Sequence, residues 1–190
     1  MKALEEKILK EGKILPGGVL RIDSFLNHQI DTKFLEEIAA EFHRLFPEEV
    51  TRILTVEASG ISMAVYTSRY YNYCPVVFAK KGEAANMSDE TYSSKLFSFT
   101  RKRDFIANVA KDYIHEGDKV LIIDDFLASG QALKALIDIC HQAKAAVVGC
   151  GVVVEKVHQS GGDLIRDMGI RVEALARIVS MDENGIVFTD

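Results

Sequence analysis

The sequence predicts an α/β fold, in which a mainly parallel, twisted sheet is flanked by helices. Runs of apolar, β-branched residues alternate with segments whose apolar residues recur at helical spacing. This alternation is typical of βαβ units and therefore of a parallel sheet. No repeat, low-complexity tract or Pro/Gly-rich linker divides the 190 residues, so residues 1–190 are expected to form a single domain.

Two amphipathic helices are predicted near the N-terminus. The first ends near Gly12, and the second covers residues 34–45, is capped by Asp31 and is stopped by Pro47. Between them, residues 14–30 form a segment too elaborate for a plain connection.

The rest of the chain continues the alternation. Strands are predicted over residues 52–57, 75–79, 119–124 and 145–155, helices over 61–71 and 130–143, and a short helix with a closing strand pair after that. Residues 82–103 are rich in Ser, Thr, Asp and Asn and too long for a passive connection, so we expect a mobile flap with some hairpin.

Composition excludes several classes of protein. Apolar residues make up 48% of the chain, and 23 Lys and Arg against 28 Asp and Glu give a net charge of −5, which argues against a nucleic-acid partner. The longest apolar stretch is well short of the ~20 residues that span a bilayer. The N-terminus lacks the apolar core of a secretory signal, so we expect a cytoplasmic protein without a membrane partner. Three cysteines without C-x-x-C spacing suggest neither disulfides nor zinc.

The most informative segment is residues 120–132. An apolar strand delivers Asp124 and Asp125 to its carboxyl end, where ligands bind in open parallel sheets. A turn of small residues then opens a helix, whose free N–H groups and dipole suit a phosphate, and Ser129 adds a hydroxyl donor. The carboxylates can accept hydrogen bonds from hydroxyl groups, so the combination fits a phosphorylated sugar.

The whole string, from Val120 to Ala132, resembles the phosphoribosyl-pyrophosphate (PRPP) signature of type I phosphoribosyltransferases. It matches neither the dinucleotide nor the P-loop pattern. The resemblance implies the type I phosphoribosyltransferase fold, with Asp124 and Asp125 as catalytic residues on the ribose hydroxyls. It also implies a 5′-phosphate site formed by Ala128, Ser129, Gly130, Gln131 and Ala132. Without the full string, an Asp pair capping a helix would be the favoured interpretation.

A second turn follows an earlier strand. Its sequence, Glu57-Ala58-Ser59-Gly60, lets backbone N–H groups approach an anion closely, and it resembles the pyrophosphate loop of the same family. Lys80 and Lys81 follow the next strand, and Lys81 is the better match for a cation on the pyrophosphate. Taken alone, the turn would indicate an ordinary helix start with Ser59 as N-cap.

The base site is predicted from both ends of the chain. Residues 24–29 resemble the hood that covers the base in xanthine phosphoribosyltransferases, which implies that Leu20 and Asn27 contact the base and Lys156 binds its oxo edge. A Lys ammonium only donates, which favours an oxo group over an amine, and an Asn amide can donate to a 2-oxo group, although it can also accept. Without the PRPP signature, Glu155-Lys156 would be an exposed pair at a strand end.

The resemblance implies transfer of the phosphoribosyl group from PRPP to N9 of xanthine. It also implies a homodimer and Mg²⁺ held mainly by PRPP or pyrophosphate oxygens and by water. Tyr92, Ser93 and the cluster Arg101, Lys102 and Arg103 are candidates to close on the pyrophosphate. The alternatives are hypoxanthine/guanine or adenine specificity, and a PRPP-sensing transcriptional regulator, against which the negative charge argues.

Overall fold

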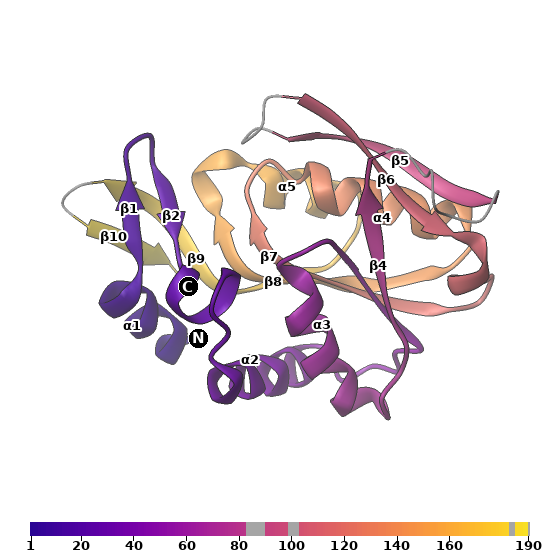
Figure 1. The fold of residues 1–190 in the computed structure, drawn as a ribbon, viewed down its shortest axis with the longest axis horizontal. Coiled ribbons are helices and arrows are strands. Elements are labelled where there is room, and N and C mark those ends of the chain that lie inside the picture. The colour runs from indigo at the N-terminus through magenta and orange to yellow at the C-terminus, as the bar shows by residue number, and fades with distance from the viewer. Residues whose placement is uncertain (83–89, 99–102, 183–184, 190) are drawn as a thin grey trace.

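The computed structural model describes residues 1–82, 90–98, 103–182 and 185–189, and its described part is built around an eight-stranded sheet (Figure 1). The strand order is β10-β9-β8-β7-β3-β4-β6-β5. The parallel strands are β9 (Val172–Asp182), β8 (Ala146–Lys156), β7 (Lys119–Leu127), β3 (Arg52–Val56) and β4 (Val76–Lys81). The antiparallel edge strands are β10 (Gly185–Thr189), β6 (Arg103–Ala110) and β5 (Thr91–Ser98). The predicted mainly parallel α/β sheet is confirmed.

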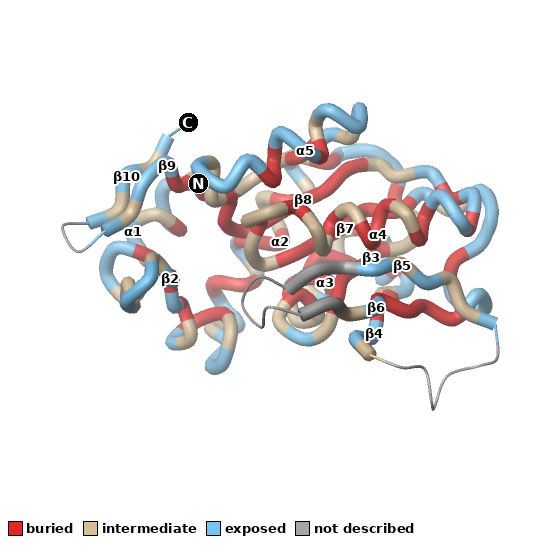
Figure 2. The backbone as a smooth tube through the Cα atoms, turned by 90° about the horizontal axis from the view of Figure 1, so that it is seen from above, coloured by how far each residue is buried: buried red, intermediate tan, exposed pale blue. Residues whose placement is uncertain are grey.

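Helices cover both faces of the sheet. One face carries α1 (Lys2–Glu11), α2 (Thr32–Leu45) and α3 (Gly60–Ser68), and the other carries α4 (Gln131–Gln142) and α5 (Gly161–Asp167) (Figure 1). Strand β7 supplies both cores, because successive side chains point to opposite faces: Leu121 packs with the first group of helices and Ile122 with the second. Figure 2 shows the resulting layer of buried strands. Burial on both faces explains the continuous apolar runs.

The element boundaries differ from prediction in a few places. Asp31 caps α2 as expected, its Oδ1 accepting from Phe34 N at 3.1 Å. Helix α3 ends at Ser68 and continues as a 3₁₀ turn, Arg69–Tyr71. Strand β7 was predicted to end at Asp124 but runs to Leu127, because it keeps its pairing with β8.

Residues 14–30, predicted to form part of a hood, fold as a small unit at one end of the sheet. Strands β1 (Lys13–Leu15) and β2 (Val19–Arg21) form an antiparallel hairpin, followed by one turn of π-helix, Asp23–Asn27. Gly17 and Gly18 make the hairpin turn with φ of +86° and +71°, a conformation that glycine adopts at little cost. This hairpin was not predicted. It lies at the same end of the molecule as β10 (Figures 1 and 2), and the two share one apolar cluster.

The predicted flap, residues 82–103, does contain part of a hairpin. β5 pairs with β6 from Thr91↔Ala110 to Ser98↔Arg103. The hairpin extends beyond the predicted segment, since β6 reaches Ala110. Residues 83–89 and 99–102 lie outside the described residues, so the motion of the flap stays a prediction. No helix in the described ranges is long and apolar enough to cross a membrane.

Candidate active site

The paired carboxylates lie in the second half of β7, at the carboxyl edge of the parallel strands. Asp124 is buried, 5% exposed, and its Oδ1 accepts from Asp125 N at 3.0 Å. Burial, followed by the charge and hydrogen bond of Asp125, raises the pKa of Asp124 well above its ordinary value of 3.8, while the charge of Lys81 acts in the opposite direction. Asp125 is half-buried. The sheet edge therefore presents one buried and one more accessible carboxyl group.

Residues 128–132, called the 128–132 loop below, comprise the loop residues 128–130 and the first two residues of α4. Gly130 has φ +78° and precedes the first helical residue, Gln131. The other loop residues, Ala128, Ser129, Gln131 and Ala132, are half-buried. The first turn of a 12-residue helix leaves backbone N–H groups without intrahelical partners, and the helix dipole adds positive potential. The loop can bind a phosphate beside the two carboxylates.

The turn at residues 57–60 lies at the end of the adjacent strand, β3. Glu57 Oε1 accepts from the Lys81 backbone N at 2.7 Å, so the structure brings the turn and Lys81 together. The peptide between Glu57 and Ala58 is cis. Ser59 precedes α3, but its side chain makes no capping hydrogen bond. Gly60 is tightly packed, since a Cβ there would lie 2.0 Å from Thr55 Oγ1. The turn thus joins Lys81 at the same sheet edge as the carboxylates.

The hood reaches this edge through Asn27. Its Nδ2 donates to Asp125 Oδ2 at 2.9 Å, and its Oδ1 is buried without a hydrogen-bond partner. Leu20 is 5% exposed and belongs to the apolar cluster that includes α1. Two predicted base contacts therefore belong to the hood, and one of them touches a predicted ribose contact.

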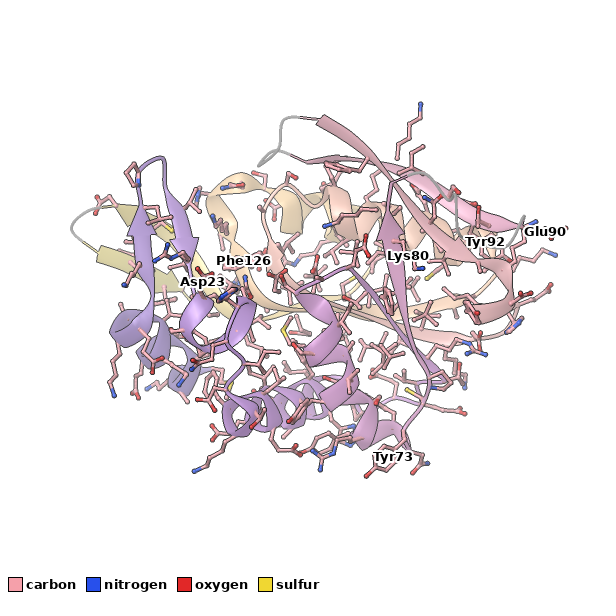
Figure 3. The ribbon with its side chains drawn as sticks, viewed as in Figure 1. Asp23, Tyr73, Lys80, Glu90, Tyr92 and Phe126 are labelled. Carbon is pink, nitrogen blue, oxygen red and sulfur yellow. The ribbon has the colours of Figure 1, made fainter. Side chains whose placement is uncertain are left out.

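Lys156 ends β8 beneath the hood. Its Nζ lies 3.5 Å from Gly18 O and 5.7 Å from the centroid of the Phe126 ring. Burial lowers the pKa of Lys156. Phe126, which sequence reasoning did not single out, follows Asp125 directly and faces Lys156; Figure 3 shows it at the end of β7 nearest the hood. The position of Phe126 directly after the Asp pair was the sequence signal that could have pointed to it.

The candidate flap residues lie in different places, and some of them fall outside the described residues. In the described structure, the backbone of Ser93 is hydrogen-bonded to the side chain of Gln142. Gln142 is the last residue of α4 and lies about 16 Å along the helix axis from the 128–132 loop. Tyr92 lies under Lys111, 5.9 Å from its Nζ to the ring centroid. Neither is brought to the carboxylates. Arg101 and Lys102 lie outside the described residues, and Arg103 begins β6.

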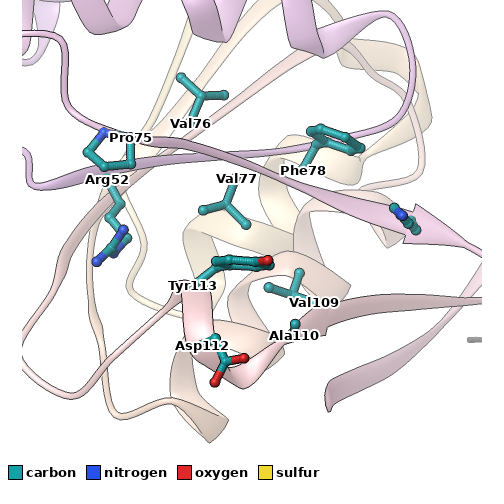
Figure 4. Close-up of a pocket in the computed structure, with 10 residues that line it drawn as sticks. Arg52, Pro75, Val76, Val77, Phe78, Val109, Ala110, Asp112 and Tyr113 are labelled. Carbon is teal, nitrogen blue, oxygen red and sulfur yellow. The ribbon is translucent and has the colours of Figure 1, made fainter. Parts of the chain in front are cut away.

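A pocket of about 420 Å³ lies away from this edge, beside β4 and the end of β6 (Figure 4). Val77, Phe78 and Tyr113 line it, together with Lys80. Because successive side chains of a strand point to opposite faces, the Lys81 side chain is expected on the other face of β4. The choice of Lys81 over Lys80 for the pyrophosphate stays a prediction.

The sequence matches the family described as "Phosphoribosyl transferase domain" over residues 21–176. The chain belongs to the phosphoribosyl transferase family. The match contains the turn at residues 57–60, the 128–132 loop, the carboxylate pair, Asn27 and Lys156, while Leu20 lies just outside it.

Full-length relatives and solved structures agree with this family. The chain is 50% identical to xanthine phosphoribosyltransferase 1 of Clostridium perfringens over 189 residues, covering 99% of this chain and all of that one. It is 47% identical to xanthine phosphoribosyltransferase of Clostridioides difficile, with the same coverage. Adenine phosphoribosyltransferases from Trypanosoma brucei (TM-score 0.79, 15% identity, 96% and 82% of the two chains) and Giardia lamblia (0.75, 17%, 92% and 97%) share the fold.

Proposed function

We propose that the chain transfers the 5-phosphoribosyl group of PRPP to N9 of xanthine, yielding xanthosine 5′-monophosphate and pyrophosphate. The bond from ribose C1 to the pyrophosphate oxygen breaks, the bond from C1 to N9 forms, and the N9 proton leaves to solvent. The observation that carries the proposal is the carboxylate pair Asp124-Asp125 beside a helix-opening loop. The loop amides would bind the 5′-phosphate and the carboxylates the ribose hydroxyls.

The pyrophosphate would lie against the turn at residues 57–60 and Lys81. The hydrogen bond from Lys81 N to Glu57 supports this role, because it ties a cationic residue to a turn with small side chains. Rate acceleration would come from holding C1 and N9 in line and from stabilising the departing anion, rather than from a covalent nucleophile. Closure of the flap over the site would exclude water and suppress hydrolysis of PRPP.

The base would bind between the hood and Lys156. The half-buried ammonium of Lys156 can donate to an oxo group and cannot accept from an amine, which favours 6-oxopurines over adenine. Asn27 Nδ2 donates one of its two N–H groups to Asp125, so the second N–H can donate to a 2-oxo group. The full-length relatives named as xanthine phosphoribosyltransferases support xanthine, whereas the adenine enzymes resemble the chain in fold alone.

Mg²⁺ is part of the same proposal. The carboxylates of Asp124, Asp125 and Glu57 are oxygen donors of the kind that Mg²⁺ prefers. However, Asp125 and Glu57 already accept hydrogen bonds from Asn27 and from the Lys81 amide. The ion would therefore be held mainly by oxygens of PRPP and pyrophosphate and by water, and when bound it would offset the charge of the leaving pyrophosphate.

A homodimer and a cytoplasmic location complete the proposal. The dimer follows from the family resemblance and is tested by sedimentation of the purified protein. A cytoplasmic location fits a substrate as highly charged as PRPP, which does not cross a bilayer unaided.

Direct product analysis tests the proposed reaction. With PRPP, Mg²⁺ and xanthine, we expect xanthosine 5′-monophosphate and pyrophosphate to form in equal amounts. Pyrophosphate without the nucleotide would indicate PRPP hydrolysis instead. Binding of PRPP with no product from any base would favour the PRPP-sensing alternative, which a salt-dependent nucleic-acid binding assay would then examine.

A further inference from the structure

Glu155 is a buried carboxylate that the proposed reaction does not use. It lies near the carboxyl end of β8 and is 2% exposed. Arg166 binds both oxygens, Nη1 to Oε1 at 2.7 Å and Nη2 to Oε2 at 2.9 Å, and Arg177 Nε donates to Oε2 at 3.0 Å. Burial raises the pKa of Glu155, but the hydrogen bonds and charges of the two arginines outweigh burial and leave the pKa lowered. The group is a carboxylate at neutral pH.

The start of α5 packs between this carboxylate and the 128–132 loop. A Cβ at Gly162 would lie 1.8 Å from Glu155 Oε1, and a Cβ at Gly161 would lie 2.2 Å from Ala128 O. Gly161 N donates to Ala128 O at 3.1 Å. A Cβ at Gly130 would in turn lie 2.8 Å from Gly161 O. Close backbone contacts therefore connect Glu155 to the loop.

We propose that Glu155, held by Arg166 and Arg177, is a positioning residue that fixes the 128–132 loop for the 5′-phosphate of PRPP. This inference rests on the function proposed above, which places the phosphate in that loop. The first turn of α5 transmits the constraint, since it has no side chains between the carboxylate and the loop backbone. Small misplacements of a binding group are enough to reduce binding or rate strongly.

Stability alone gives a poor reason for this cluster. Breaking a buried ion pair is costly, but replacing it with apolar residues of similar volume is often neutral or stabilising. A bidentate Arg–carboxylate pair supplies something that apolar packing lacks, namely a fixed relative orientation of the groups it joins. Here, Arg166 within α5 is joined to Glu155 at the end of β8. The pair thus sets the direction in which α5 leaves the sheet edge.

Ribose 5-phosphate binding, measured by titration calorimetry, tests the inference without depending on turnover. Glu155→Gln keeps the side-chain shape but removes the charge, and Arg166→Lys keeps the charge but loses the planar fork. We expect each variant to weaken ribose 5-phosphate binding about fivefold or more. In the full reaction, KM for PRPP should rise by a similar factor, with kcat within about twofold of the wild-type value, because the lost interaction is one of binding.

Asp118→Asn is the matched control. Asp118 lies at the opposite, amino end of β7 and accepts from Arg52 Nε at 2.6 Å and from His115 N at 2.8 Å. This variant should lower the melting temperature but leave ribose 5-phosphate binding unchanged. The inference is wrong if the Glu155 and Arg166 variants bind within about twofold of wild type, or if the control loses as much affinity as they do.

Misfolding of a variant and failure of the proposed function can each be told apart from failure of this inference. Should Glu155→Gln fail to fold, Arg166→Lys decides the question in the same titration. A wild-type protein that binds ribose 5-phosphate but transfers the phosphoribosyl group of PRPP to no base would overturn the proposed function, while the titration would still decide the role of Glu155.

Discussion

Replacing Lys156 with Met tests the base site at its most specific contact. The substitution removes the ammonium group and keeps an unbranched chain of similar length. Lys156 is half-buried, and its Nζ lies 3.5 Å from Gly18 O and 5.7 Å from the Phe126 ring centroid. If Lys156 donates to the oxo edge of xanthine, the variant loses a charge-assisted hydrogen bond. Such a bond is worth about 1.5–3 kcal/mol, so kcat/KM for xanthine should fall about 10- to 150-fold.

The same substitution should lower activity but raise the stability of the folded protein. Burial lowers the pKa of Lys156 below its ordinary value of 10.5, so the folded protein binds this proton less tightly than the unfolded chain does. Between the lowered pKa and 10.5 the unfolded state holds more protons, and stability therefore rises with pH in that window. Lys156→Met should lack this rise and should unfold at a higher denaturant concentration than wild type at neutral pH.

Initial rates with xanthine, together with urea unfolding at pH 7 and pH 10, measure both effects. Lys119→Met is the control, because Lys119 is an exposed lysine at the amino end of the neighbouring strand β7. Its kcat/KM should stay at the wild-type value. A Lys156→Met enzyme that uses xanthine as well as wild type does would refute the assignment of Lys156 to the oxo edge.

Three other predictions follow from the described contacts. Asp124→Asn should reduce kcat/KM about 100-fold yet raise the unfolding free energy at pH 8. The stability gain arises because the pKa of Asp124 is raised in the folded protein, so the stability of the wild type falls as the pH rises from 3.8 through that pKa. Unfolding measured at pH 5 and pH 8 would show whether the variant lacks this loss of stability. Gly130→Ala should destabilise the folded protein by about 1–3 kcal/mol and raise KM for PRPP, because Gly130 has φ +78° and an added Cβ would meet Gly161 O. A variant with the thermal stability and KM of the wild type would contradict this prediction. All three cysteines are buried, and burial raises the pKa of Cys74 to about 11. An aromatic disulfide reagent at pH 8 should therefore label none of them in the native protein and all three in guanidinium. Rapid labelling of the native protein would be inconsistent with the fold.

The central strands could be predicted because their signal is local. β7 and β8 are buried by helices on both faces, so their sequences are continuous apolar runs that need no knowledge of distant partners. The meeting of the 57–60 turn with the Asp124 edge could also be anticipated, because neighbouring parallel strands end at the same side of the sheet.

β6 was missed partly because tertiary contacts invert the burial of two of its residues. Ile106 is 39% exposed, whereas Asn108 is 4% exposed, the opposite of what their side chains suggest. Asn108 can be buried because its side chain accepts from Ser93 Oγ and donates to Gly82 O. These partners lie 15 and 26 residues away in the chain, so no local pattern indicates them.

The burial of Glu155 was hidden for the same reason. As a charged residue at the end of an apolar strand, it matches the pattern of an exposed strand end. Its partners, Arg166 and Arg177, come from α5 and β9, 11 and 22 residues later. Only the packed structure shows that two guanidinium groups compensate the buried carboxylate.

The most direct test of the account is pyrophosphate release with PRPP and Mg²⁺ when xanthine, guanine, hypoxanthine, adenine and orotate are offered separately at equal concentrations. The account predicts release with xanthine, and much slower release with adenine, whose amine cannot accept from Lys156. Preferred turnover of adenine would contradict the base site while leaving the PRPP site in place. No release with any base would contradict the proposed transferase activity itself.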